Sequence, residues 1–256
     1  MAPGPIFNGV GAALVTLFRE DGDLDAGATA ELACRLVECG IAAVVVAGTT
    51  GEAFALDPAE RAELIGTVKS ALASTGVPVI AGTGAPTGRQ AARLTAQARQ
   101  AGADGVLTLS PAGAGDPRPY YEMVSIAADG LPLLAYHYPK VSTPGISLEV
   151  LADLPVDGIK DSSGDAARLL ATLDSWDKPV YPGASSLTFL ASQLGCPGMI
   201  LALANAEPET CIAAWRGDAG AQLKLAKSRN AEAAGARGIK KLVAARFGSP
   251  ATCRVA

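Results

Sequence analysis

The sequence predicts an α/β protein of the (β/α)8 TIM-barrel class with extra C-terminal helices, and three observations lead to this prediction. The chain has 256 residues, 49% hydrophobic and 18% charged, which suits one large core. A local pattern recurs: an Ala-rich amphipathic stretch, a Gly, then a short aliphatic run that ends in Gly, Thr or Ser. Such runs are typical of strands buried on both faces, and eight of them alternating with helical patterns predict a closed parallel barrel.

The clearest copies of this pattern lie at 38–50, 100–111 and 193–205. In each copy the Gly indicates a helix end and the aliphatic run indicates the next strand. Filling the gaps gives strands expected near 10–17, 42–47, 77–82, 104–109, 132–137, 156–160, 178–182 and 198–203.

Helical patterns fill the spaces between these strands. The stretch at 57–72 has Pro58 at its first turn and apolar residues at helical spacing. A doubly wound open sheet is the structural alternative, but no G-x-G-x-x-G follows the first strand. After the eighth strand, helical character continues, for example at 238–247. We therefore expect a barrel over 1–205 and a helical extension packed on it over 206–256.

Composition narrows the class of partner. The formal net charge of −4 gives no basic surface for nucleic acid or anionic membranes. Five cysteines without a C-x-x-C pair indicate neither a disulfide framework nor a zinc site. The N-terminus lacks a basic region before its apolar residues, and no run of about 18 apolar residues predicts a membrane span. These features favour a cytoplasmic protein.

In a barrel of this class the active site lies where the strands end, so the residues at those ends are the candidates. His137 is the only histidine, which excludes a metal site built on several imidazoles. For His137 itself, supporting the residues that contact the substrate, or packing, is favoured over catalysis. Glu52, Asp161 and Asp165 could bind magnesium, but helix starts and loops explain carboxylates equally well. The Gly-rich stretch at 82–88 could hold a phosphate, although glycines after a strand more often permit a turn.

Lys160 is the residue at these strand ends that most needs an explanation. A free lysine amine, with a pKa of about 10.4, is neutral only about once in 2,500 molecules at pH 7. Burial at the end of a barrel strand disfavours the charged form, and lowering the pKa by about 3 corresponds to about 4 kcal/mol. The neutral amine can attack a ketone to form an imine, which withdraws electrons from the neighbouring carbon. This chemistry needs no metal or cofactor.

Two further positions fit imine chemistry. Tyr136 carries a phenol that can relay protons if a partner such as Thr49 holds it. The hydroxyls and backbone amides of Thr49 and Thr50 lie at a strand-to-loop turn and suit a small carboxylate.

The residues resemble the class I pyruvate-dependent aldolases of the dihydrodipicolinate synthase and N-acetylneuraminate lyase family. Four stretches carry the resemblance, in order and at family-like spacing: G-T-T-G-E at 48–52, A-G-T-G at 81–84, Y-H-Y-P at 136–139 and G-I-K-D-S-S-G-D at 158–165. The resemblance implies a TIM barrel that forms a homo-oligomer, either a dimer or a tetramer. It also implies that Lys160 is the Schiff-base lysine, Tyr136 the proton relay, and Thr49 and Thr50 the pyruvate carboxylate site.

The resemblance places Gly183 and the backbone near Ile200 in the same pocket, with the Ser162 hydroxyl facing the substrate and His137 in the position of the usual asparagine.

Several departures from the synthases bear on the substrate. The synthases carry an arginine after the tyrosine motif, whereas Lys140 is the nearest cation here. They also carry a tyrosine pair after strand four, where this chain has S-P-A-G-A-G at 110–115. The C-terminal part is shortened around 231–237. The K-D-S-S-G-D form is more similar to the 4-hydroxy-2-oxoglutarate and 2-keto-3-deoxy-sugar-acid aldolases.

The expected activity is therefore reversible cleavage of a 4-hydroxy-2-oxo acid into pyruvate and an aldehyde. Condensation of the dihydrodipicolinate synthase type, or a dehydratase acting on a 2-oxo acid, remains an alternative. A non-catalytic barrel that binds a 2-oxo acid is the alternative from another class, and a phosphate-binding barrel enzyme is the third.

Overall fold

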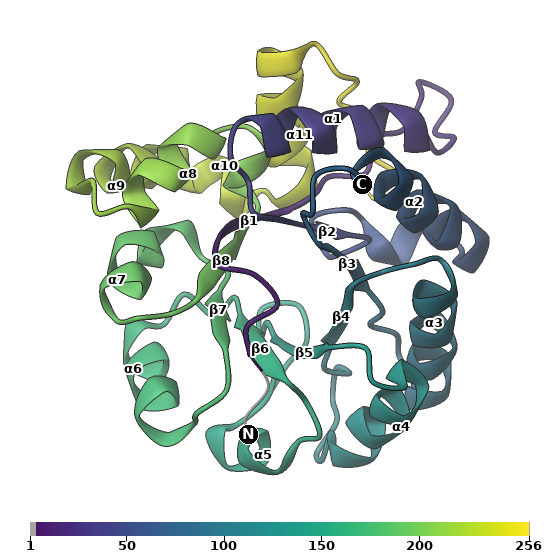
Figure 1. Ribbon diagram of the computed structural model, residues 1–256, viewed down its shortest axis with the longest axis vertical. Helices are drawn as coiled ribbons and strands as arrows, with labels where there is room; N and C mark the ends of the chain where they lie inside the picture. The colour runs from purple at the N-terminus through teal and green to yellow at the C-terminus, as the bar shows by residue number, and fades with distance from the viewer. Residues whose placement is uncertain (1–3, 256) are drawn as a thin grey trace.

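A computed structural model describes residues 4–255 and shows eight parallel strands curled into a barrel with helices around it (Figure 1). The hydrogen-bonded order is β7-β6-β5-β4-β3-β2-β1-β8, and the two outermost strands of this ladder, β7 and β8, lie against each other. The sheet therefore closes, and the expected (β/α)8 TIM barrel is confirmed. The strands are β1 (Gly9–Ala13), β2 (Ala43–Val46), β3 (Val79–Gly82), β4 (Gly105–Leu109), β5 (Leu133–His137), β6 (Gly158–Asp161), β7 (Val180–Pro182) and β8 (Gly198–Leu201).

Each expected strand has a counterpart, and the largest difference is in β1. The pattern predicts a strand as far as residue 17, but the ladder with β2 and β8 ends at Ala13. Leu14 to Phe18 stay buried because they pack under the helices, and Phe18 instead pairs with Leu24 in an isolated bridge. A buried apolar run does not by itself show where strand pairing stops.

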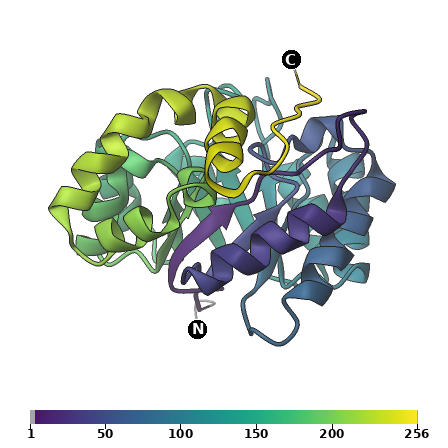
Figure 2. The same ribbon diagram turned by 90° about the horizontal axis from the view of Figure 1, so that it is seen from above.

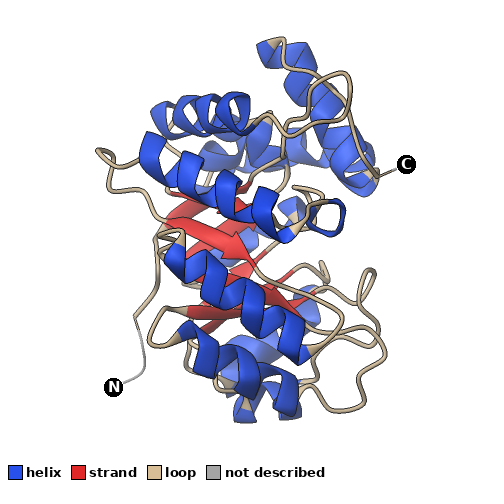
Figure 3. Cartoon of the chain, turned by 90° about the vertical axis from the view of Figure 1, so that its right-hand side faces the viewer, coloured by secondary structure: helices blue, strands red, loops and turns tan. Residues whose placement is uncertain are grey.

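Helices surround the barrel, as Figure 3 shows from the side. The predicted helix at 57–72 is α2, which begins with a capping box formed by Asp57 and Glu60. The α-helices are α1 (Ala26–Glu38), α2 (Pro58–Ala71), α3 (Gly88–Gln100), α4 (Arg118–Ala128), α5 (Leu148–Asp153), α6 (Ala166–Ser175), α7 (Thr188–Gln193), α8 (Pro208–Trp215), α9 (Ala219–Leu225), α10 (Arg229–Ala233) and α11 (Gly235–Phe247). The short 3-10 turns are η1 (Ala53–Ala55), η2 (Ser185–Leu187), η3 (Leu203–Asn205) and η4 (Ala226–Ser228). None of the helices in the described part of the chain has the length and apolar character needed to cross a membrane.

Two hydrophobic clusters follow from the alternation of side chains along each strand. In β5, Leu134 and Tyr136 belong to a cluster inside the barrel, while Leu133 and Ala135 belong to the larger cluster under the helices. Phe7, which precedes β1, enters the inner cluster and stacks on Tyr181 with ring centroids 4.7 Å apart. The barrel is therefore a filled core, and its chemistry is confined to its ends.

The C-terminal helices α8 to α11 gather on one side of the barrel (Figure 2), as expected. The segment after α11 returns to the loop that follows β2. There the carboxylate of Glu52 accepts hydrogen bonds from Lys240 Nζ of α11 and from the backbone N–H groups of Arg254 and Val255. Lys240 and Glu52 side chains are 0% and 1% exposed, so this ion pair lies in the interior. Arg254, near the end of the described chain, thereby holds a loop residue that lies 202 positions earlier.

Replacing Lys240 with Met is expected to lower the free energy of unfolding by about 3–5 kcal/mol, because it leaves the buried Glu52 carboxylate without its cation. Urea denaturation of the two proteins measures this difference. Lys241→Met is the matched control, because Lys241 is the next residue of α11 and is exposed. Equal losses in the two variants would contradict the account.

Candidate active site

A cavity of about 580 Å³ opens where the strands end, at the face that holds active sites in barrels of this class. Its lining includes six of the eight residues that the sequence analysis placed in the site: Thr49, Thr50, Tyr136, Lys160, Ser162 and Gly183. These residues come from the ends of β2, β5, β6 and β7 and the loops that follow them. Parallel pairing of neighbouring strands brings them together, since it sets Tyr136 beside Lys160 and Lys160 beside Tyr181.

Lys160 is the buried cationic group of this cavity. It belongs to β6, where Ile159 faces the helices and Lys160 faces the barrel interior, and it is only 4% exposed. Its Nζ lies 4.4 Å from the centroid of the Tyr136 ring and makes no ion pair within residues 4–255. Burial lowers the Lys160 pKa from 10.5 to about 7, and the charge of Glu232 only partly opposes this. About half of the amine is therefore neutral at pH 7.

Tyr136 carries a phenol on the strand next to this amine. Burial raises its pKa from 10.0 to about 12, while hydrogen bonding to the hydroxyls of Ser162 and Thr49 works in the opposite direction. The phenol is therefore protonated at neutral pH and lies between two hydroxyl groups. Tyr138 stacks on its ring, with centroids 5.8 Å apart, and fixes its plane. This chain of hydroxyls can carry a proton to or from a group bound near Lys160.

Gly183 makes room for the lysine side chain. A Cβ at this position would lie 2.1 Å from Ser162 Oγ and 2.9 Å from Lys160 Cε, which no side chain tolerates. The Gly183 N–H donates to the Asp161 carbonyl at 2.6 Å, and the Ser162 N–H donates to the His137 carbonyl at 2.9 Å. The backbone around Lys160 is thus fixed by neighbours on both sides.

The loop with Thr49 and Thr50 is held by close backbone contacts. Its start, Ala47, has a positive φ of 51°, and a Cβ at Gly82 would lie 2.0 Å from the Ala47 carbonyl oxygen. Gly82 in the Gly-rich stretch therefore serves close packing of β3 against this loop. Thr16 Oγ1 donates to the Gly51 carbonyl at 2.7 Å, and Glu52 is held by Lys240. The two threonines project from a rigid turn.

His137 and Ile200, the remaining two site residues expected from the sequence, are not brought to the cavity lining. His137 follows Tyr136 and so faces the opposite side of β5, where its Nδ1 accepts the Ile146 N–H at 2.9 Å. Burial, followed by the charge of Arg168, lowers its pKa to about 4, so it is a neutral packing group. This position fits the packing role favoured for His137 from the sequence, and His137 is not among the residues that line the cavity. Ile200 lies fully buried in the inner cluster, and Ala202, two residues later, lines the cavity.

The three carboxylates considered for magnesium have protein partners. Asp161 accepts from Arg168 Nε at 2.8 Å and from the Ser163 N–H, and Asp165 caps the first turn of α6. Glu52 is the acceptor for Lys240 and the chain end. Across residues 4–255, no group of three or more His, Cys, Asp or Glu side chains is placed to hold a metal ion.

The structure adds lining residues that sequence patterns did not identify. Tyr138 and Ser185 come from loops after β5 and β7, while Arg229, Asn230 and Glu232 come from α10. Lys140, the cation noted beside the tyrosine motif, also lines the cavity. The α10 residues had no sequence signal, because their position depends on how the C-terminal helices pack. Helix α10 overlaps the segment in which the resemblance indicated a shortening.

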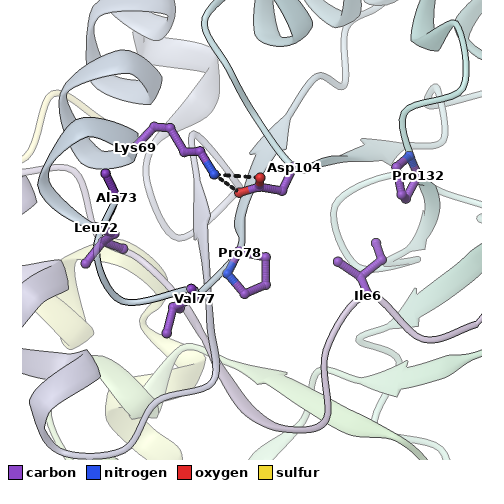
Figure 4. A pocket seen from close by; sticks show the side chains of 9 residues that line it. Ile6, Lys69, Leu72, Ala73, Val77, Pro78, Asp104 and Pro132 are labelled. Carbon is purple, nitrogen blue, oxygen red and sulfur yellow. Dashed lines mark hydrogen bonds and ion pairs between the residues drawn. The ribbon is translucent and has the colours of Figure 1, made fainter.

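A second cavity, of about 420 Å³, lies at the opposite end of the barrel (Figure 4). Its lining comes mainly from residues that precede strands, such as Pro78 and Pro132. The charged residues there neutralise each other, because Lys69 Nζ lies 2.6 Å from both carboxylate oxygens of Asp104. The chemistry-bearing groups are therefore concentrated in the cavity around Lys160.

Comparisons with known proteins agree with this geometry. Residues 6–243 match the profile of the Dihydrodipicolinate synthetase family. An uncharacterized DapA-like lyase of Halobacterium salinarum is 35% identical over 214 residues, covering 80% of this chain and 70% of the relative. A 4-hydroxy-tetrahydrodipicolinate synthase of Methanosarcina mazei is 32% identical over 216 residues, with 80% and 72% covered. The structure of the chloride-inhibited dihydrodipicolinate synthase from Acinetobacter baumannii complexed with pyruvate is similar with a TM-score of 0.76 at 30% identity, covering 88% of this chain and 81% of that one.

The Lys160 pKa predicts how stability depends on pH. Because the folded-state pKa is about 7 and the ordinary value is 10.5, the unfolded chain binds more protons between these values, and stability attributable to Lys160 rises with pH across that window. Below pH 7 the buried amine costs up to about 5 kcal/mol. Lys160→Met is therefore expected to unfold at higher urea concentration than the wild type at pH 6, with the difference shrinking toward pH 10.

Lys140→Met, which removes a lysine from the exposed rim, is the control for this measurement and should show no such trend. A Lys160→Met difference that stays constant from pH 6 to pH 10 would show that the amine is not held in its neutral form.

Proposed function

Because the chain belongs to the dihydrodipicolinate synthetase family, a family of lyases and aldolases, we propose that it reversibly cleaves a 4-hydroxy-2-oxo acid into pyruvate and an aldehyde through a Schiff base. The environment of Lys160 is the observation that most supports a Schiff base. Its amine is buried in the cavity without an ion-pair partner in the described chain and lies beside the ring of Tyr136. A lysine in this environment is a nucleophile at neutral pH. The relatives that bear lyase or synthase names agree with carbon–carbon bond chemistry.

In the direction of synthesis, the neutral Lys160 amine adds to the ketone carbon of pyruvate. Two protons pass to the ketone oxygen, one from the attacking nitrogen, and water leaves, so that an iminium joins Lys160 Nζ to the former carbonyl carbon. The iminium accepts the electron pair of a C3–H bond as the proton departs, which gives an enamine. Tyr136, whose phenol lies near the hydroxyls of Thr49 and Ser162, delivers and removes these protons.

The enamine carbon then attacks the aldehyde carbon, and the aldehyde oxygen takes a proton to become the 4-hydroxyl group. Water adds back to the iminium and releases the 4-hydroxy-2-oxo acid and the free lysine. Cleavage is the same sequence in reverse. The hydroxyls and backbone amides of Thr49 and Thr50 hold the pyruvate carboxylate, and the sequence of steps needs neither a metal nor a cofactor.

The lining of the cavity favours a 4-hydroxy-2-oxoglutarate or 2-keto-3-deoxy sugar acid over the substrate pair of dihydrodipicolinate synthase. The position after the tyrosine motif carries Lys140, which cannot form the bidentate contact that arginine makes with a carboxylate. The S-P-A-G-A-G loop supplies no tyrosine. Tyr120 and Tyr121 of α4 are buried, and their hydroxyls donate to the backbone carbonyls of Leu109 and Thr108. The Ser162 hydroxyl faces the same cavity as Lys160.

Dihydrodipicolinate-type condensation, or dehydration of a 2-oxo acid, uses the same imine and is the alternative within the class. We further propose that the protein works in the cytoplasm as a homo-oligomer, a dimer or a tetramer, and that neither nucleic acid nor a membrane is a partner.

The function is tested by following the methyl protons of pyruvate by NMR in deuterium oxide. The wild type should exchange them, because enamine formation removes a C3 proton in every cycle. Exchange should rise with pH through a midpoint near pH 7, the Lys160 pKa, and level off above it as Lys160 loses its proton. EDTA should leave the rate unchanged. Lys160→Ala should abolish exchange, and Tyr136→Phe should lower it by about 10²- to 10⁴-fold.

Lys140→Met is the control, because it removes a rim lysine without touching the imine. Saturable binding of pyruvate without any exchange in the wild type would favour the non-catalytic 2-oxo-acid-binding barrel. Exchange that EDTA abolishes would point to a metal-assisted enzyme.

A further inference from the structure

The C-terminal helix α10 contributes a carboxylate to the cavity at a position fixed by the loop after β7. Glu232 lines the same cavity as Lys160, and its two oxygens accept from Ser185. The Ser185 N–H lies 3.3 Å from Oε1 and the Ser185 hydroxyl 2.6 Å from Oε2. Ser185 is only 2% exposed and is itself held by Gln222 of α9, whose Nε2 donates to the Ser185 carbonyl at 3.0 Å. Glu232 is therefore oriented by a buried partner.

This arrangement leaves Glu232 able to accept further hydrogen bonds. Each carboxylate oxygen has about two acceptor positions, and Ser185 uses one on each. Its charge reaches the reacting groups, because Glu232 is the charged residue that raises the pKa of both Lys160 and Tyr138. Apart from Lys160 itself, the cations that line the cavity, Lys140 and Arg229, are exposed to solvent, which screens them. Glu232 is the acidic residue of this lining, and it is half-buried.

We propose that Glu232 selects the aldehyde: its carboxylate accepts a hydrogen bond from a hydroxyl of the aldehyde-derived part of the substrate and repels aldehydes that carry a carboxylate beside the carbonyl. This inference rests on the proposed lyase function and refines it toward neutral polyhydroxy aldehydes, and so toward 2-keto-3-deoxy sugar acids. A carboxylate attached to C4 would lie within the same cavity as Glu232, where the cations other than the imine nitrogen are exposed to solvent. Hydroxyls that line the cavity, such as those of Ser162, Ser163 and Ser186, suit the same partner.

The test compares a neutral hydroxyl-bearing aldehyde with an aldehyde that carries a carboxylate. D-Glyceraldehyde carries hydroxyls and no charge, whereas glyoxylate carries a carboxylate beside its carbonyl. Condensation of each with pyruvate is measured as kcat/KM for the wild type and for Glu232→Gln, which keeps the size and the acceptor oxygen but removes the charge. The wild type should prefer D-glyceraldehyde, and Glu232→Gln should shift the ratio toward glyoxylate by at least about tenfold, or about 1.4 kcal/mol.

A matched control separates this effect from a loss of packing. Glu207→Gln removes the same charge from a carboxylate that accepts from Ser228 in η4, next to α10, but does not line the cavity. It should leave the aldehyde ratio unchanged. A second readout is the pH profile of pyruvate methyl exchange: Glu232→Gln should move its acid limb to lower pH, because the charge that raises the Lys160 pKa is gone, whereas Glu207→Gln should not.

Ser185→Ala keeps the charge but removes the hydroxyl that donates to Oε2, so only the longer bond from the backbone N–H holds the carboxylate. It should lower kcat/KM for D-glyceraldehyde while glyoxylate remains a poor substrate.

The outcomes are distinguishable. A wild type that prefers glyoxylate, or that fails to condense D-glyceraldehyde, would overturn the inference, as would a ratio that moves equally in Glu232→Gln and Glu207→Gln. If pyruvate exchange is intact in these cases, only the role of Glu232 is refuted. Absence of exchange in the wild type would refute the lyase function together with this inference.

Discussion

The structure depends on one constraint, the burial of the Lys160 amine inside a closed barrel without a counter-ion. A protonated amine there is largely removed from water and has no ion-pair partner in the described chain, so burial lowers the pKa and raises the fraction of neutral amine. The rest of the site follows from accommodating this side chain. Gly183 leaves space for it, strand alternation directs it inward, and the parallel register sets Tyr136 beside it. Burying Lys160 lowers the stability of the fold when the amine is protonated. The same burial lowers the pKa of the amine, which imine formation requires.

The barrel alone does not complete the site, since the C-terminal extension contacts it at two places. Lys240 and the last described residues hold Glu52, which fixes the loop that carries Thr49 and Thr50. Glu232 of α10 reaches Ser185 on another side of the same cavity. One contact is a buried ion pair beside the loop of Thr49 and Thr50, and the other adds a charge to the cavity. The extension therefore contributes groups to both the interior and the cavity, although it lies outside the repeating βα units.

The sequence was sufficient for the features that are local. Aliphatic runs preceded by Gly predicted three strands directly, and the spacing between them predicted the other five. Lys160, Tyr136 and the two threonines were found because strand ends meet at one face of a barrel. Features set by three-dimensional packing were not predictable. The end of β1, for example, depends on which residues find a ladder partner. Glu232 enters the cavity only through the packing of α9 and α10.

The most direct test of the central claim is to incubate the protein with pyruvate and sodium borohydride and then measure intact and peptide masses. If Lys160 forms an imine, reduction traps one carboxyethyl group on the peptide that contains Lys160, and Lys160→Met gains none. An adduct on another lysine, or none on the folded wild type near pH 8, would contradict the claim that this buried amine is the nucleophile.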